Sequence, residues 1–381
     1  MEITQQTVQI NQALRLESGR VLNRYALAYE TYGQLNAVGD NAVLVCHGYT
    51  ANQHAAGCES EGSAKSGWWD AAIGPGKPID TDRYFVLSSN VLGGAGGSSS
   101  AASIDPQSGK PYGMRFPLIT IGDMVEAQCQ LASHLGIARF HAVIGGCMGG
   151  FQVMEWMARF PSRLNQAMII GATHRVSAHA IALMAIIREA IRADPDWQGG
   201  DYYGSGCKPE LGMGLGAMFG ICIWMGRAVM EKRFAGRVSG DGHLQYGFGA
   251  EFEVERFLQQ VGSGSGERID PNALIYLGRA MQYFDLSRRY RQLSEAFAGF
   301  RGEALLVSYD SDWRYPADEM ELINQALLAA GIPSHHATLS SEFGHGAFIY
   351  DFASLAPVLE DFLLMPAQVC PNLQRELPRS A

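Results

Sequence analysis

The sequence has no long apolar run, no paired cysteine spacing and no excess of basic residues. The longest apolar runs, such as 181–187, fall far short of the roughly 20 residues that a membrane-spanning helix needs. The N-terminus has neither the basic region nor the apolar core of a signal peptide. We therefore expect a cytoplasmic protein that does not enter a membrane.

Cysteine is scarce, and its spacing is irregular. The seven cysteines lie at positions 46, 58, 129, 147, 207, 222 and 370, without the short paired spacings of a disulfide framework or a zinc site. His54 and Cys58 could share a helix face, but no second ligand pair follows at zinc spacing. We expect reduced thiols and no metal.

Negative charge exceeds positive charge. The 38 Asp and Glu residues against 29 Lys and Arg give a net charge of -9, which repels phosphate backbones and anionic headgroups. Nucleic acids and membranes are therefore not expected as partners.

The distribution of apolar residues predicts an α/β fold. Short, continuously apolar runs alternate with segments of helical periodicity, which is typical of a parallel sheet covered by helices on both faces. From about residue 174 to 300 the strand pattern gives way to helical spacing, and strand-like runs then resume. We expect a core domain made of 1–173 and 301–381 and an inserted helical lid at 174–300. The apolar runs read as strands lie at 42–46, 84–87, 140–144, 167–170, 304–308 and 336–339.

A glycine-rich turn carries the clearest chemical signal. Cys147 is the centre of a G-x-C-x-G motif that directly follows one apolar run and directly precedes a helical segment. A nucleophile elbow has this form, because the positions two before and two after the nucleophile must be small. Such a turn also places the thiol at a helix N-terminus, which stabilises a thiolate. We predict that Cys147 is a nucleophile, although a lone cysteine is more often a buried structural residue.

Two later loops offer partners for this nucleophile. In this fold the order along the chain is nucleophile, acid, histidine, with the partners at the carboxyl ends of strands. Asp312 follows one predicted strand, with Asp310 as a rival acid, and His345 follows the last one between two glycines. We expect a Cys147, Asp312 and His345 triad, with an oxyanion hole formed by the backbone N–H groups of Tyr49 and Met148.

The chain resembles the homoserine O-acetyltransferase family of α/β-hydrolases. The resemblance implies a triad of nucleophile, Asp and His at Cys147, Asp312 and His345, a helical lid through which a homodimer forms, no cofactor, and acetyl-CoA as co-substrate if the chain is a transferase. The matching segments are 67–70, 73–77, 80–86, 90–93, 116–117, 120–121, 123–125, 193–197, 199–203, 283–286 and 310–313.

Three positions depart from the family pattern. Cys147 stands where the family has serine. Phe219 stands where the family has an arginine that binds the substrate carboxylate, and Gly346 stands where it has an aspartate that binds the substrate ammonium. Both charge partners of a zwitterion are then missing, and each charge-assisted hydrogen bond is worth about 1.5 to 3 kcal/mol.

These departures favour an uncharged substrate. We expect a short-chain (acetyl) carboxylic-ester hydrolase that works through acyl-Cys147, with Phe219 and Gly346 next to the substrate. One alternative is an O-acetyltransferase acting on homoserine or a related alcohol, with Arg227 or Arg279 replacing the missing arginine. Another is a catalytically silent binding protein that kept the fold.

Overall fold

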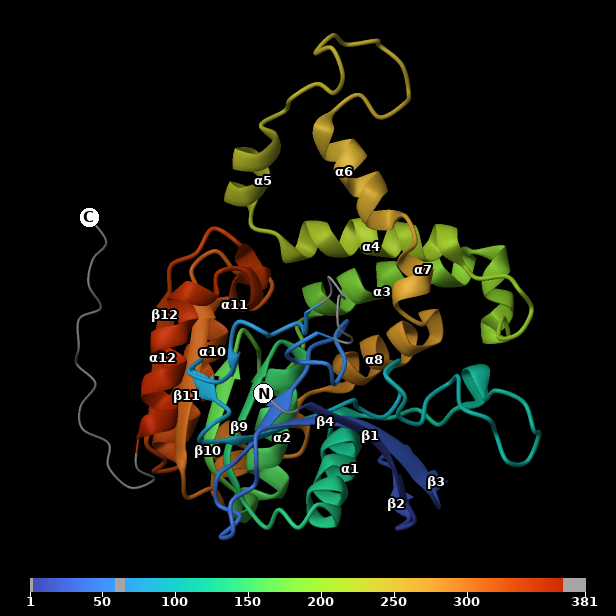
Figure 1. Ribbon diagram of the computed structural model, residues 1–381. Coiled ribbons are helices and arrows are strands. Elements are labelled where there is room, and N and C mark those ends of the chain that lie inside the picture. Colours follow the sequence, from blue (N-terminus) through green and yellow to red (C-terminus); the bar gives the residue numbers. More distant parts are fainter. Residues whose placement is uncertain (1–2, 59–65, 366–381) are drawn as a thin grey trace.

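A mixed sheet of eight strands forms the centre of the molecule (Figure 1). The computed structural model describes residues 3–58 and 66–365, so Cys370 lies outside the described residues. The strand order is β1-β4-β8-β5-β9-β10-β11-β12. Strand β4 is antiparallel to both of its neighbours, β1 and β8, and the other neighbouring pairs in this sheet are parallel. The strands are β1 (Ile3–Ile10), β4 (Tyr25–Tyr32), β8 (Phe85–Ser89), β5 (Ala42–Cys46), β9 (Phe140–Gly146), β10 (Leu164–Ile170), β11 (Glu303–Tyr309) and β12 (Ser334–Leu339).

The sheet confirms the expected fold class. Strands β5, β9, β10 and β11 are almost entirely buried, as their continuous apolar runs predict. Their parallel alignment brings the carboxyl ends of β9, β11 and β12 to one edge, where the loops carrying Cys147, Asp312 and His345 begin. Strands β1 and β4 were not expected, and the polar residues of β1 make its pattern far weaker than that of the central strands.

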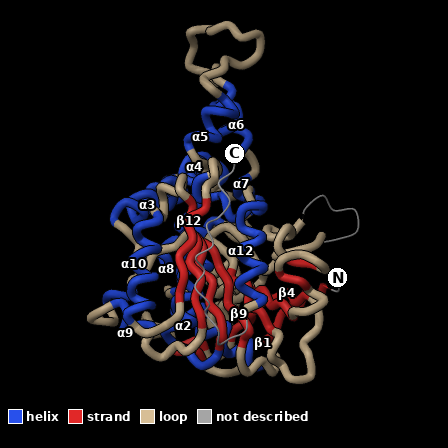
Figure 2. Tube along the Cα trace, turned by 90° about the vertical axis from the view of Figure 1, so that its left-hand side faces the viewer, coloured by secondary structure: helices blue, strands red, loops and turns tan. Residues whose placement is uncertain are grey.

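Helices cover both faces of this sheet. Figure 2 shows α2 (Met148–Arg159) and α10 (Ala317–Ala329) on one side and α12 (Phe352–Leu364) on the other. Helix α1 (Ile121–His134) packs against α2 and begins with a capping box. In it the Asp123 N–H donates to Thr120 Oγ1 at 3.2 Å and the Thr120 N–H donates to Asp123 Oδ2 at 2.9 Å.

The segment between β10 and β11, which contains the residues predicted as a lid, forms helices α3 to α9. Helices α3 and α4 lie above the carboxyl edge of the sheet, and α5 and α6 project away from it (Figure 1). Helix α8 belongs to the core as well, since Leu277, Ala280 and Met281 are part of the main apolar cluster. The helices are α3 (Ala178–Ala193), α4 (Glu210–Trp224), α5 (Arg227–Phe234), α6 (Glu253–Gly262), α7 (Ser265–Arg268), α8 (Pro271–Tyr283) and α9 (Leu293–Phe297).

We find no single helix in the described residues that is both long and apolar enough to cross a membrane. Helices α4 and α5 reach that length and composition only when taken together, and the chain bends by 106° between them.

Candidate active site

Cys147 lies in a sharp turn between β9 and α2. Its backbone has φ 57° and ψ −124°, a region that non-glycine residues seldom adopt. The flanking glycines are sterically required. A Cβ on Gly145 would lie 2.8 Å from the Cα of Gly149, and a Cβ on Gly149 would overlap the carbonyl oxygen of Cys46. The turn therefore has the geometry of a nucleophile elbow, which presents the Cys147 side chain above the sheet.

His345 and Asp312 form a buried pair. His345 Nδ1 lies 2.8 Å from Asp312 Oδ2, and both side chains are almost fully shielded from solvent. The other oxygen of Asp312 accepts the backbone N–H groups of Arg314 and Tyr315, at 2.9 and 3.1 Å. Asp310 is exposed and accepts the N–H of Ser341. Of the two candidate acids, the structure therefore brings Asp312 to the imidazole.

The thiol and the imidazole perturb each other. Burial alone would raise the pKa of Cys147, but the positive charges of His345 and Arg314 lower it from 9.0 to about 7. Burial alone would lower the pKa of His345, but the charges of Asp312 and Cys147 raise it to about 9. His345 Nε2 is buried and has no hydrogen-bonding partner among the described residues. The arrangement favours a thiolate–imidazolium pair near neutral pH.

The backbone N–H of Met148 lies next to the sulfur, and the loop that carries Tyr49 passes close to Cys147. The Met148 N–H is one of the groups that lower the pKa of Cys147. Tyr49 belongs to the loop after β5, and in that loop a Cβ on Gly48 would lie 3.7 Å from the Cβ of Cys147. The Tyr49 N–H donates to no other group of the described residues, so it is available to a ligand. These positions suit the two predicted oxyanion donors.

A buried histidine fixes this loop. His47 Nε2 accepts the N–H of Val91 at 3.2 Å, so its proton resides on Nδ1, which donates to the Gly48 carbonyl at 2.8 Å. Burial lowers the pKa of His47 to about 4, which keeps the ring neutral. The Gln152 amide of α2 also donates to the His47 carbonyl, at 3.1 Å. Helix α2 thus holds both Cys147 and the oxyanion loop.

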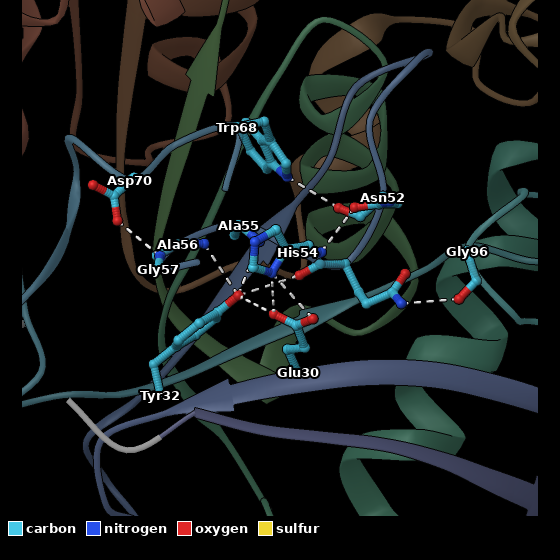
Figure 3. A network of polar contacts seen from close by, with 11 residues as sticks. Glu30, Tyr32, Asn52, His54, Ala55, Ala56, Gly57, Trp68, Asp70 and Gly96 are labelled. Carbon is cyan, nitrogen blue, oxygen red and sulfur yellow. Dashed lines mark hydrogen bonds and ion pairs between the residues drawn. The ribbon is translucent and has the colours of Figure 1, made fainter. Parts of the chain in front are cut away.

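A second polar network holds the continuation of the loop (Figure 3). Glu30 of β4 is buried and lies 3.0 Å from His54 Nδ1, and the Tyr32 hydroxyl donates to the same carboxylate at 2.6 Å. Trp68 donates from Nε1 to the Asn52 carbonyl at 3.0 Å. Trp68 also lines a cavity beside Cys147, so this network connects the sheet to the wall of that cavity.

A cavity of about 490 Å³ opens beside Cys147. Its wall is mainly apolar and comes from residues 48–51, helices α3, α4 and α7, and the segment 348–350. Among the described residues, the charged side chains that line it are Arg268 and Arg314. Arg314 lies two residues after Asp312 and was not predicted as a site residue.

The predicted substrate contacts need correction. Phe219 does not line this cavity itself. It packs against a small apolar cluster that includes the lining residues Ile187 and Met213, while Ala217, Gly220 and Ile221 of the same helix line the cavity. Gly346 is buried under the indole ring of Trp224. Neither proposed replacement for the missing arginine lines the cavity, and Arg279 lies over the ring of Tyr283 instead.

No metal centre is evident in residues 3–58 and 66–365, where no three His, Cys, Asp or Glu side chains cluster as a ligand set. All six described cysteines are free thiols.

Comparison with known proteins identifies the family. A family model described as the alpha/beta hydrolase fold matches residues 41–352. The chain is 43% identical to a homoserine O-acetyltransferase of Caulobacter vibrioides, over 93% of this chain and 92% of that protein. It is 42% identical to a homoserine O-succinyltransferase of Halothiobacillus neapolitanus, over 94% and 89% respectively. The chain belongs to the homoserine O-acyltransferase family.

Solved structures of this family and its neighbours share the fold. The crystal structure of homoserine O-acetyltransferase from Bacillus anthracis superposes with a TM-score of 0.89 at 27% identity, covering 97% of this chain and 99% of that one. The crystal structure of esterase E22 gives a TM-score of 0.86 at 25% identity, covering 95% and 100%. The homoserine O-acyltransferase family and at least one esterase therefore share this arrangement of sheet and helices.

Proposed function

We propose that this protein is an O-acyltransferase that takes an acyl group from a coenzyme A thioester, carries it on Cys147 and delivers it to a small alcohol. The curated relatives named above are acyltransferases, which favours this alternative over the ester hydrolase expected from the sequence. The observation that carries the proposal is the Cys147 thiol, buried at an elbow beside His345 and opening into the cavity.

The chemistry of a thiol nucleophile supports a thioester donor. Transfer from coenzyme A to Cys147 exchanges one thioester for another, so the acyl-enzyme keeps the reactivity of the donor. An ordinary ester would instead have to form a thioester, which is an unfavourable exchange. Cysteine at this position therefore suits a coenzyme A donor better than an ester substrate.

Each step moves a proton through His345. The Cys147 thiolate attacks the acyl carbonyl, the N–H groups of Tyr49 and Met148 stabilise the oxyanion, and the departing coenzyme A thiolate takes the proton from the imidazolium. The acceptor hydroxyl then gives its proton to neutral His345 while its oxygen attacks the acyl-thioester. Collapse of that intermediate regenerates the Cys147 thiolate and the imidazolium. Asp312 keeps the imidazole oriented through both steps.

Arg314 adds a carboxylate-binding group to this site. It lines the cavity and its charge acts on Cys147, yet it forms no ion pair with a carboxylate of the described residues. A guanidinium in this position would bind a carboxylate of the substrate, either on the acyl group, as in a succinyl donor, or on the acceptor. We propose the acyl group, because Arg314 lies next to the sulfur that carries it.

The test measures release of free coenzyme A from acetyl-CoA and from succinyl-CoA, with and without homoserine or another small alcohol. We expect release that depends on the acceptor, is lost in Cys147→Ala, and is faster with succinyl-CoA. Equal release without any acceptor, or faster turnover of nitrophenyl acetate, would support the hydrolase instead.

Arg314→Met separates the two sources of the carboxylate. If Arg314 binds the acyl group, the preference for succinyl-CoA over acetyl-CoA falls about 10- to 100-fold, the range for a lost charge-assisted hydrogen bond. If it binds the acceptor, that preference stays unchanged and the KM for a carboxylate-bearing acceptor rises. The ratio of the two donors corrects for any general slowing that the lost positive charge causes at Cys147.

A further inference from the structure

An indole ring occupies the space beside Gly346. This glycine directly follows His345, and a Cβ added to it would overlap Trp224 Nε1 and lie 2.9 Å from Trp224 Cδ1. The Trp224 ring stands edge-on to the imidazole of His345, with centroids 5.1 Å apart and planes at 85°. It also packs against Phe348, at 5.9 Å. Trp224 closes α4 onto the catalytic loop and lines the cavity.

The groups facing this part of the cavity disfavour a bound ammonium. Trp224 Nε1 donates to no other group of the described residues, and an indole N–H can only donate, so it has nothing to offer a second donor. The nearest charge that lines the cavity is that of Arg314, because His345 is neutral when the acceptor enters and Asp312 lies behind its ring, 2.8 Å from Nδ1. Arg268 adds a second cationic side chain farther along the wall, where its guanidinium donates to the carbonyls of Val261 and Ser263. No carboxylate lines the cavity within the described part of the chain.

Trp224 affects the acceptor, because the acceptor hydroxyl that attacks the acyl-enzyme must approach His345. An acceptor with an ammonium group next to its reacting end would bring a positive charge against the N–H edge of the indole, which is electropositive, and into a cavity lined by Arg268 and Arg314. The described residues that line the cavity offer no counter-charge to replace the water of that ammonium. A carboxylate on the acceptor meets no such penalty.

We propose that Trp224 is a specificity-determining residue that closes the space beside His345 and selects small hydroxy-carboxylates without an ammonium group over amino-acid alcohols. The inference rests on the proposed acyl transfer through Cys147. It predicts that this chain differs in acceptor from the relatives named for homoserine.

The decisive comparison uses two acceptors that differ only in the amino group. Purified full-length protein is supplied with a saturating acyl-CoA and with either 4-hydroxybutyrate or homoserine, and kcat/KM is measured for each. We expect 4-hydroxybutyrate to be preferred about 100-fold, the range for one uncompensated charge-assisted contact. Equal use of the two acceptors, or a preference for homoserine, would overturn the proposal.

Two variants test the role of the indole. Trp224→Ala opens the space, and the double variant Trp224→Ala with Gly346→Asp also supplies a carboxylate beside His345. We expect the single variant to lose part of the preference and the double variant to accept homoserine at least about 10-fold better than the single variant does. Identical acceptor ratios in both variants and the unmodified protein would show that Trp224 does not set specificity.

Failure of this inference can be distinguished from failure of the proposed function. Acylation of Cys147 by an acyl-CoA without acceptor, read by intact mass, shows that the site works in each variant. If Cys147 is not acylated in the unmodified protein, the proposed function fails. If it is acylated and homoserine reacts as well as 4-hydroxybutyrate, only the inference about Trp224 fails. The acceptor comparison in the unmodified protein decides the question even if a variant does not fold.

Discussion

Asp312→Asn tests the electrostatic coupling on which the reactivity of Cys147 depends. In the structure the carboxylate lies 2.8 Å from His345 Nδ1 and raises the pKa of that ring to about 9. The resulting imidazolium, together with Arg314, lowers the pKa of the thiol to about 7. An amide at position 312 removes the charge, so the pKa of His345 falls and that of Cys147 rises toward its ordinary value of 9.0. At pH 7 the thiolate fraction then drops from about one half toward about one hundredth, so alkylation slows by up to about 50-fold.

The assay is alkylation of Cys147 by iodoacetamide over the range from about pH 5 to about pH 10, followed by mass spectrometry of the labelled peptide. The rate for the unmodified protein should rise as pH increases through about 7, because the thiolate forms there. Asp310→Asn is the matched control, since Asp310 is exposed and bonds only to Ser341 among the described residues. An unchanged midpoint in Asp312→Asn, or an equal change in Asp310→Asn, would refute the coupling.

Two further variants test the elbow and the expected dimer. Gly149→Ala should lower the free energy of unfolding by about 3 kcal/mol in a denaturant titration, because its Cβ would overlap the Cys46 carbonyl. The control is Gly249→Ala. A Cβ on Gly249 meets open space, so this variant should change the free energy of unfolding by less than about 0.5 kcal/mol. A similar loss in both would contradict the steric argument. Light scattering should show the homodimer that is expected to form through the lid. The double variant Tyr246→Ser with Phe248→Ser should weaken this dimer, because both rings are exposed on the segment between α5 and α6. A monomeric unmodified protein would contradict the expectation.

The sequence predicted the parts of the site that have local signals. Cys147 is flanked by glycines between an apolar run and a helix, and that pattern reflects the close backbone approach observed at the elbow. Asp312 and His345 each follow a strand of the parallel sheet, so the fold alone places their loops at one edge. Arg314 was not predicted, although a charged residue in the loop after β11 was a usable signal, because its sequence position does not show that its side chain reaches the cavity.

The lid could not be predicted in the same way. Helix α4 is apolar on almost every side, so its sequence does not specify which face meets the cavity. This explains why Phe219 was expected in the cavity and lies elsewhere, and why the approach of Trp224 to Gly346 had no signal in the sequence. That contact depends on how α4 packs over the sheet, and residues far apart along the chain determine it.

Detection of the acyl-enzyme is the most direct test of acyl transfer through Cys147. Intact mass spectrometry after mixing with acetyl-CoA or succinyl-CoA, without acceptor, should show one added acyl group located on Cys147. The added mass should disappear when an alcohol acceptor is supplied, and it should be absent in Cys147→Ala. Transfer to the alcohol by Cys147→Ala at the unmodified rate, or turnover without any acyl group on Cys147, would contradict the account.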